Sequence, residues 1–471
     1  MEEQISIPIW LFMVLVVVSA IALMDRILIP STRWLLRRRI NKVLEEIGTR
    51  LDIEIRPFQL TKRQVLIDRL SYDPAVIEAI KIYAKEKDMP LEMVQKKVIA
   101  YAKEIVPSFN AYFYFRIGYY IAKKIARLLY RVRVGIVEDH HYKKIDPDST
   151  VVFIMNHRSN MDYILVAFLA AERTTLSYAV GEWAKIWPLH MLFRFMGAFF
   201  VRRNSGNELY RRVLERYIHM ATQQGVCQAV FLEGNLSKDG KLQEPRLGLI
   251  DYMLRSFDPE KDRDVIFIPV GINYDRTIED RSLLRSLNPD LQKRGLFYVF
   301  RTTLGFLMRN LTQMLISKWR RFGYACVNFG TPISAKTYSH SNHVIFKNLS
   351  RNQRFPEIQK LCNHLMSGIS DVVPIVPVSL VSTVFIENKD KKLTLPEIEN
   401  ECESVLIKIK TNGAPVLETA HSSKKHVISE AISLMLLRNM IKEEYGLFSC
   451  NESETGLLEY YANSINHWLY R

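Results

Sequence analysis

Short apolar runs, divided by polar loops and helical stretches, constrain the fold of this chain more than any other feature. The runs are Val151 to Met155, Gly197 to Val201, Gln228 to Leu232, Val265 to Val270 and Ala325 to Phe329. Runs of this length are typical of strands that are buried on both faces of a sheet. Between them, Met161 to Ala171 and Tyr210 to Gln223 show helical spacing of apolar residues. The alternation predicts an α/β domain whose mostly parallel sheet is covered by helices.

The segments on either side of this domain predict helices. From Arg33 to about Val134 the apolar residues recur at helical spacing, and the chain after Pro332 is again mainly helical in pattern. A length of 471 residues suits several domains. We therefore expect an anchor at 1–25, a basic, membrane-proximal helical region at 26–136, the α/β domain at 137–335 and a mainly helical C-terminal domain at 336–471.

The anchor is predicted from an uncharged apolar segment, Ile5 to Met24. As a helix this segment is about 30 Å long, which matches the hydrocarbon thickness of a bilayer. Glu2 and Glu3 precede it and arginines follow from Arg33, whereas a cleaved signal peptide carries its positive charge first. The positive-inside rule then predicts a single-pass protein with its body in the cytoplasm. A buried core helix is the alternative.

The charge of the chain indicates an anionic partner. The net charge is +15, and residues Arg26 to Thr150 hold 25 basic against 15 acidic side chains. Such an excess suits a nucleic acid, an anionic bilayer or phosphorylated small molecules. Aromatic residues accompany the cations between Phe109 and Val134, which suits a helix in the headgroup layer or, equally, an amphipathic helix with a solvated basic face. The five cysteines are scattered singly, so we expect reduced thiols and no metal site.

One loop carries residues suited to acid–base chemistry. The sequence has no P-loop, G-x-G-x-x-G, G-x-S-x-G or H-E-x-x-H motif, which argues against the enzymes that depend on them. His157 follows the predicted strand Val151 to Met155, and Asp162 lies in the first turn of the next helix, which Ser159 or Asn160 can cap. The carboxylate can orient the imidazole so that its free nitrogen accepts a proton. We expect this ring at the rim of a pocket, since open α/β sheets bind ligands at the carboxyl ends of their strands; a structural histidine is the alternative.

Further loops at predicted strand ends could surround the same crevice. The second block ends in Arg202 and Arg203, whose forked donors suit a phosphate unless they are merely solvated. The third block, Phe231 to Lys238, supplies an acid, a glycine, a hydroxyl and a cation, and alone is only a plausible turn. In the fourth block Pro269 closes a strand, which alone suggests an edge or loop-entry position.

Taken in order, these four blocks resemble those of the glycerophospholipid acyltransferases. That family has H-x-x-x-x-D, an arginine block, F-x-E-G-x-x-S and a proline block. The H-R-S-x-M-D-Y form at His157 to Tyr163 and the C-terminal stretch Tyr460 to His467 look closest to the bacterial glycerol-3-phosphate acyltransferases of the PlsB type. The likeness covers roughly Tyr101 to Tyr470. Where that branch has arginines beside the serine, this chain has Leu236 and Lys238.

The resemblance implies a role for each block. His157 would be the catalytic base and Asp162 its partner. The substrate-binding residues would be Arg158, Arg202, Arg203, Glu233, Gly234, Ser237 and Lys238 for the acceptor, with Pro269 on the side of the acyl donor. A thioester donor needs no protein nucleophile, because its carbonyl is electrophilic and its thiolate leaves readily. Backbone amides after Asn160 are candidates for stabilising the oxyanion.

The resemblance therefore predicts an enzyme of the bacterial cytoplasmic (inner) membrane. It would transfer an acyl group from acyl-CoA or acyl-ACP to the sn-1 hydroxyl of glycerol-3-phosphate, giving lysophosphatidate, without a metal or other cofactor. Its partners would be these substrates and anionic lipids, with no nucleic acid. Lysophosphatidate or dihydroxyacetone phosphate are alternative acceptors. A membrane-tethered adaptor that binds anionic lipid or nucleic acid without turnover is the alternative from another class.

Overall fold

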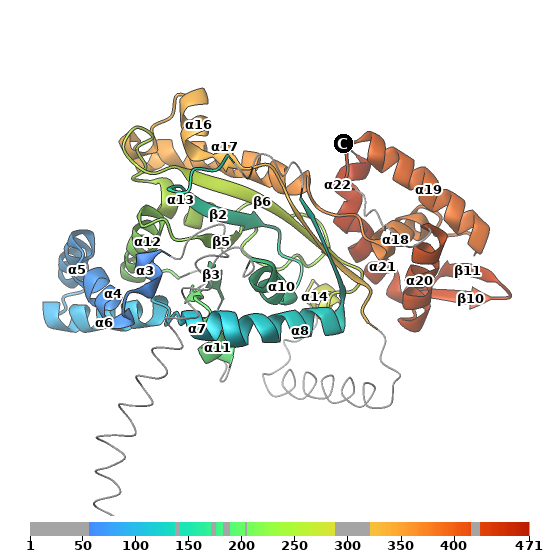
Figure 1. Ribbon diagram of the computed structural model, residues 1–471, viewed down its shortest axis with the longest axis horizontal. Coiled ribbons are helices and arrows are strands. Elements are labelled where there is room, and N and C mark those ends of the chain that lie inside the picture. The colour runs from blue at the N-terminus through green and yellow to red at the C-terminus, as the bar shows by residue number, and fades with distance from the viewer. Residues whose placement is uncertain are drawn as a thin grey trace, which may run out of the picture.

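The computed structural model describes residues 56–136, 142, 144–170, 176–181, 189–202, 205–287, 321–415 and 424–470. These residues form a central sheet with helices on both faces and a mainly helical C-terminal region beside it (Figure 1). The expected anchor at Ile5 to Met24 lies outside the described residues. Within the described ranges, no helix combines the length and the apolar character that a membrane crossing needs.

The sheet follows the order β1-β7-β6-β2-β5-β3-β4, with the short strand β8 paired to β6. β2 pairs in parallel with both β5 and β6, and β1 pairs in parallel with β7, whereas β7 and β8 run antiparallel to β6. The prediction of a mostly parallel sheet is therefore confirmed. The strand bounds are β1 Arg131–Ile136, β2 Thr150–Met155, β3 Ser177–Val180, β4 Phe199–Phe200, β5 Gln228–Phe231, β6 Val265–Tyr274, β7 Tyr324–Phe329 and β8 Ile333–Ser334.

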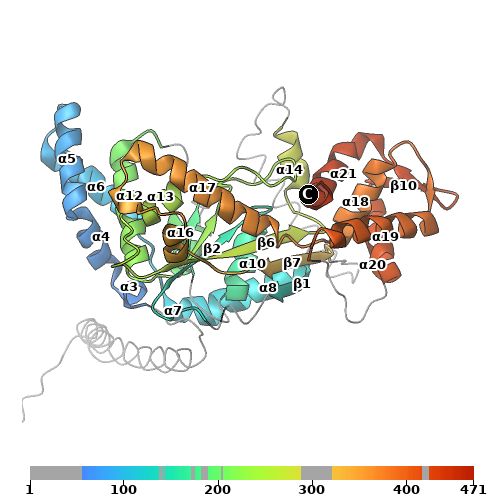
Figure 2. The same ribbon diagram turned by 90° about the horizontal axis from the view of Figure 1, so that it is seen from above.

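Strand β2 shows why the apolar runs form a doubly covered sheet. All six of its residues are buried, and successive side chains point to opposite faces. Val152 and Ile154 pack in one hydrophobic cluster with α12 (Glu208–Gln223), α13 (Gly248–Leu254) and α17 (Arg351–Ser370). Val151 and Phe153 pack in a second cluster with α8 (Tyr119–Leu129) and α10 (Met161–Ala170). Figure 2 shows α17 crossing over the strands.

The region before the sheet is helical as far as α8, and strand β1 follows. The helices α3 to α6 belong to the same hydrophobic cluster as α12. The range 26–136 was expected to be helical, but Arg131–Ile136 is the edge strand β1, because its residues pair with β7. The helices here are α3 Pro57–Leu60, α4 Arg63–Ser71, α5 Pro74–Glu86, α6 Leu91–Ile105 and α7 Ala111–Phe113, with the π-helical turn η2 Tyr114–Gly118 leading into α8.

The C-terminal region has its own core. Its hydrophobic cluster begins at Ile375 and includes Trp468, whereas α17 packs in the cluster of β2 and β6. A three-stranded antiparallel sheet, β10-β11-β9, accompanies the expected helices. The remaining elements are α11 Leu189–Phe195, α14 Asp280–Arg285, α16 Ala335–Ser341, η4 Phe346–Asn348, α18 Pro377–Glu387, β9 Leu393–Thr394, α19 Leu395–Thr411, α20 Lys424–Leu437, β10 Ile441–Glu444, β11 Leu447–Cys450, η5 Glu452–Glu454, α21 Thr455–Ala462, η6 Asn463–Ile465 and α22 Asn466–Leu469.

Candidate active site

The turn between β2 and α10 is fixed at both of its ends. The side chain of Asn156 accepts a hydrogen bond from the amide of Ile272 and donates one to the Ile272 carbonyl, at 2.8 and 2.9 Å. This pair continues the β2–β6 ladder one residue beyond the end of β2. At the other end, Ser159 Oγ accepts from the amide of Met161 at 3.1 Å, which caps α10. The loop of His157 is therefore rigidly placed at the carboxyl end of β2.

His157 and Asp162 form the predicted pair. The distance from His157 Nδ1 to Asp162 Oδ2 is 2.9 Å. The same oxygen accepts from the backbone amides of Arg158 and Ser159, at 2.7 and 3.0 Å. An oxygen that accepts from two amides is an acceptor toward the ring as well, so we assign the ring proton to Nδ1. Nε2 is then the nitrogen that can take a proton.

A third residue, Tyr274 at the end of β6, completes the environment of the carboxylate. Its hydroxyl donates to Asp162 Oδ1 at 2.6 Å, and its ring packs against Tyr130 with centroids 5.3 Å apart. Burial, followed by the charge of Asp162, raises the pKa of Tyr274 well above its usual value, which keeps the hydroxyl a donor. Tyr274 is not among the site residues predicted from the sequence, because the fourth predicted strand ends at Val270. Period-two alternation extended through Ile272 would have placed Tyr274 on the face of α10.

The imidazole does not lie at an open rim, and that expectation is wrong. The side chain of His157 is 1% exposed. Phe231 stacks on the ring at a centroid distance of 3.9 Å, and Tyr163 meets it edge-on at 5.4 Å. Nε2 is buried and has no hydrogen-bond partner among the described residues. Leaving a buried polar atom unpaired costs about 1–3 kcal/mol, so the unpaired Nε2 is a feature that packing alone does not explain.

The third block lies against the His157 loop. The amide of Ser237 donates to the His157 carbonyl at 2.9 Å, and the Ser237 hydroxyl donates to the Lys241 carbonyl at 2.7 Å. The Ser237 hydroxyl therefore stabilises the turn from Ser237 to Lys241. Gly234 has a φ of +70°, which a side chain rarely adopts, and a Cβ there would lie 2.9 Å from Arg246 Cγ. Lys238 is exposed at the surface of this loop.

Arg158, in the loop of His157, and Glu233, which contacts the backbone of His157, hold more unpaired polar atoms. Nε and Nη2 of Arg158 and Oε2 of Glu233 are buried and lack hydrogen-bond partners among the described residues. Arg158 Nη1 donates to the Gly240 carbonyl. Burial raises the pKa of Glu233 well above its usual value, opposed by the charge of Arg158 and by the backbone of His157. The unpaired Nε and Nη2 of Arg158 are donors that can bind an anion.

The arginines of the second block do not join this cluster in the described structure. Arg202 makes a two-pronged ion pair with Glu104 of α6, through Nε to Oε1 at 2.9 Å and Nη2 to Oε2 at 2.5 Å. Its guanidinium lies over the rings of Tyr101 and Tyr210, at 5.2 and 5.0 Å. Arg202 would have to leave Glu104 before it could bind an acceptor. Arg203 lies outside the described residues.

Pro269 lies inside a strand and does not close one, contrary to expectation. Strand β6 continues to Tyr274. On its outer side β6 pairs with β8 up to Phe267 and with β7 from Val270, so Pro269 falls where the partner strand changes and no amide donor is needed. The Pro269 carbonyl accepts from the amide of Gly330 at 2.8 Å. Its position thus has a structural reason independent of any substrate.

The first two amides after Asn160, which were proposed to stabilise an oxyanion, already have partners: that of Met161 donates to Ser159 Oγ at 3.1 Å and that of Asp162 to the Ser159 carbonyl at 3.0 Å. The preceding amides of Arg158 and Ser159 donate to Asp162. The amide of Asn160 donates to Glu279 Oε1 at 3.3 Å, and the Ser159 hydroxyl donates to Glu279 Oε2 at 2.7 Å. Burial raises the pKa of Glu279, opposed by these hydrogen bonds. The start of α10 is thus engaged in holding the turn.

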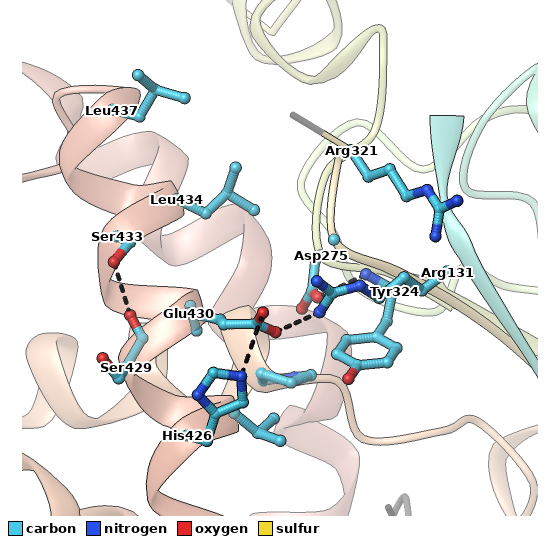
Figure 3. A pocket seen from close by; sticks show the side chains of 14 residues that line it. Arg131, Asp275, Arg321, Tyr324, His426, Ser429, Glu430, Ser433, Leu434 and Leu437 are labelled. Carbon is cyan, nitrogen blue, oxygen red and sulfur yellow. Dashed lines mark hydrogen bonds and ion pairs between the residues drawn. The ribbon is translucent and has the colours of Figure 1, made fainter. Parts of the chain in front are cut away.

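A cavity of about 600 Å³ lies between the sheet and α20, and its lining includes neither His157 nor Asp162, Arg158 or Glu233 (Figure 3). Asp275, the residue directly after β6, lines this cavity together with Arg131 and Glu430, which form an ion pair. Burial raises the pKa of Asp275 to about 7, although the amides of Tyr324 and Val378 donate to its oxygens. Among the described residues, no group of three or more His, Cys, Asp or Glu side chains could hold a metal ion.

Comparison with known families and proteins shows that the chain is similar to acyltransferases. A profile of the family described as Acyltransferase matches residues 136–273, and one described as Glycerol-3-phosphate acyltransferase C-terminal region matches residues 310–471. The glycerol-3-phosphate acyltransferase of Actinobacillus succinogenes is 24% identical over 432 residues, which cover 87% of this chain and 50% of that protein. The corresponding protein of Pseudomonas paraeruginosa is 25% identical over 441 residues, covering 91% and 51%.

The chain spans about half the length of the curated relatives it matches. Among solved structures, the 1-acyl-sn-glycerophosphate (LPA) acyltransferase PlsC from Thermotoga maritima is 13% identical, with 65% of this chain and 96% of that chain covered. The TM-score between the two structures is 0.31.

Proposed function

We propose that the chain is a glycerophospholipid acyltransferase, and that it acylates the sn-1 hydroxyl of glycerol-3-phosphate to form lysophosphatidate. The donor would be a fatty acyl thioester, either acyl-CoA or acyl-ACP. The observation that carries the proposal is the unpaired Nε2 of His157, on a ring whose other nitrogen is held by Asp162. That arrangement is what a general base for a hydroxyl requires.

In the proposed reaction, Nε2 of His157 accepts the proton of the acceptor hydroxyl while the oxygen attacks the thioester carbonyl. The imidazolium that forms is stabilised by the carboxylate of Asp162, which Tyr274 and two backbone amides hold in place. When the carbonyl re-forms, the C–S bond breaks, the thiolate leaves, and it takes up the proton from His157. No covalent acyl-enzyme and no cofactor is needed for this balance.

The buried cation of Arg158 is the group best placed to hold the acceptor's phosphate. It lies in the loop of His157, and its Nε and Nη2 have no partner among the described residues. Burial raises the pKa of Glu233, which weakens the repulsion between its carboxyl and a phosphate bound beside it. Because the His157 ring is 1% exposed, the acceptor must displace side chains that cover Nε2 before it can react. Water would be excluded from the reacting atoms by the same cover.

We propose further that the enzyme works at the bacterial cytoplasmic membrane, with the segment Ile5 to Met24 as anchor. Among the described residues, the helical stretch from η2 through α8 supports a location at the membrane surface. Ile117, Tyr120 and Ile121 are 39%, 61% and 39% exposed, and Lys124 and Arg127 are exposed beside them. Exposed apolar side chains among cations suit an anionic headgroup layer. Helices α8 and α11 lie on the same side of the sheet (Figure 1).

The test is turnover by the purified full-length chain in lipid or detergent, with labelled glycerol-3-phosphate and with acyl-CoA or acyl-ACP. We expect lysophosphatidate from the wild type and none from His157→Ala. His219→Ala is the matched control, because His219 is also buried with an unpaired ring nitrogen but lies on α12. Acylation by His157→Ala at the wild-type rate would refute the assignment of the base. Preferred acylation of lysophosphatidate or dihydroxyacetone phosphate in competition would refute the acceptor.

A further inference from the structure

The C-terminal region reaches the loops of the first and third blocks through α21 and η6. Tyr460 and Asn463 make these contacts: Asn463 Nδ2 donates to the Asp239 carbonyl at 2.9 Å, and the Tyr460 backbone packs against Gly240. Gly240 has a φ of +87°, and a Cβ there would lie 1.9 Å from the Tyr460 carbonyl oxygen. Only a glycine permits this approach. Residues more than 200 positions apart in the sequence therefore form one wall of the site.

The ring of Tyr460 is a platform for Arg158. The guanidinium carbon of Arg158 lies 4.7 Å from the centroid of the Tyr460 ring. Its one hydrogen bond to a described residue goes from Nη1 to the Gly240 carbonyl, in the same wall. Stacking engages the flat face of a guanidinium and leaves its edge free to donate. Tyr460 therefore holds the cation without consuming Nε and Nη2, which remain unpaired in the described structure.

Among the described residues, the hydroxyl of Tyr460 has one partner and makes one weak hydrogen bond. It accepts this bond from Thr277 Oγ1 at 3.4 Å, near the limit for such a bond. Burial raises the pKa of Tyr460, so the ring stays neutral. Tyr461 meets the ring edge-on at 5.2 Å and is itself bonded to Asp280 through its hydroxyl. These contacts thus fix the plane of the Tyr460 ring, whose face contacts the guanidinium of Arg158.

We infer that Tyr460 is a positioning residue for the acceptor site: its ring holds the Arg158 guanidinium flat, so that Nε and Nη2 point at the phosphate of the acceptor. Asn463 supports this by fixing the Asp239–Gly240 peptide that accepts from Arg158. The inference rests on the proposed function for the identity of the acceptor. It gives the C-terminal region a direct part in binding the phosphorylated substrate.

The test compares two replacements of Tyr460 that share a shape. Phenylalanine keeps the negative ring face. Pentafluorophenylalanine reverses the charge distribution of the ring and can be introduced with an expanded genetic code. With Tyr460→Phe we expect a KM for glycerol-3-phosphate within about twofold of wild type. With the fluorinated ring we expect that KM to rise about tenfold, with the KM for the acyl donor unchanged. Equal acceptor KM values for the two rings would overturn the inference.

A double-mutant cycle shows whether the effect passes through Arg158. In an Arg158→Ala background, the fluorinated ring should add nothing to the acceptor KM, since the partner cation is gone. An undiminished, additive effect would mean that Tyr460 acts elsewhere. Calorimetric titration with glycerol-3-phosphate, and with inorganic phosphate as a second probe, measures the same dependence without turnover. An inactive wild type that binds both probes through Arg158 and Tyr460 would refute the proposed acyl transfer and leave this inference standing.

Discussion

The hydroxyl of Tyr274 donates a 2.6 Å hydrogen bond to Oδ1 of Asp162, the oxygen that does not face the imidazole. A bond to a charged group contributes about 1.5–3 kcal/mol, and here it orients the carboxylate behind the proposed base. Tyr274→Phe should therefore lower kcat about tenfold or more while leaving KM for both substrates nearly unchanged. Steady-state kinetics of the full-length chain measure this.

The control for that variant is Tyr130→Phe. The two rings pack against each other, and the Tyr130 hydroxyl also makes a buried hydrogen bond, 2.7 Å to the Arg276 carbonyl. Tyr130→Phe should lose a similar amount of stability but keep its kcat. If the two variants lose kcat equally, the role of Tyr274 is structural and not specific to Asp162.

Gly240→Ala tests the contact between the C-terminal region and the third block. A side chain at a φ of +87° costs about 1–2 kcal/mol, and a Cβ would also collide with the Tyr460 carbonyl. Gly446→Ala is matched in backbone, with a φ of +77°, and its Cβ would meet nothing within 4 Å. We expect both variants to melt earlier than wild type, Gly240→Ala by clearly more, and only Gly240→Ala to lose acyl transfer. Equal melting temperatures for Gly240→Ala and Gly446→Ala would show that the backbone at Tyr460 can move to accommodate the added Cβ.

Much of the sheet followed from local pattern, because a buried strand is apolar on both faces whatever its neighbours are. The edge strand β1 did not, because it directly continues a basic helical stretch, although Arg131 and Arg133 alternate with apolar residues as in a half-buried strand. Its strand form depends on pairing with β7, a partner nearly 200 residues away. The short alternation does not reveal that partner.

The candidate site divides in the same way. The spacing from His157 to Asp162 is short, so the sequence could place the two together. Tyr274 and Tyr460 reach the site from a distant strand end and from the C-terminal region, and their contacts are set by tertiary packing. The pairing of Arg202 with Glu104, and the burial of the His157 ring, likewise depend on elements that lie far apart in the sequence.

The ion pair of Arg202 with Glu104 gives a separate prediction. Because the pair joins β4's end to α6, Arg202→Ala and Glu104→Gln should lower the melting temperature by similar, small amounts; such partly exposed pairs contribute about 1 kcal/mol or less. Both should keep the acceptor KM within about twofold. A rise in acceptor KM confined to Arg202→Ala would instead return Arg202 to the acceptor site that the family resemblance implies.

Asp275 predicts how stability depends on pH. Its pKa is raised to about 7 by burial, from 3.8, and Glu430 of α20 raises it further while Arg131 lowers it. Between these values the folded chain keeps a proton that the unfolded chain has lost, so the free energy of unfolding falls as pH rises from about 4 to about 7. Three pKa units correspond to a few kcal/mol, about 1.4 per unit.

Thermal unfolding of wild type and Asp275→Asn at pH 5 and pH 8 isolates this contribution. Asparagine cannot ionise. Asp275 accepts hydrogen bonds from the amides of Tyr324 and Val378, and the NH₂ group of asparagine would face one of these two donors without being able to accept from it. We therefore expect the variant to be less stable than wild type at pH 5 and to lose less melting temperature on going to pH 8. The difference between the two proteins removes the parallel contributions of Glu233 and Glu279, whose pKa values are also raised by burial. Melting temperatures that fall equally in both proteins would mean that Asp275 is already ionised at pH 5, held by the two amides despite its burial.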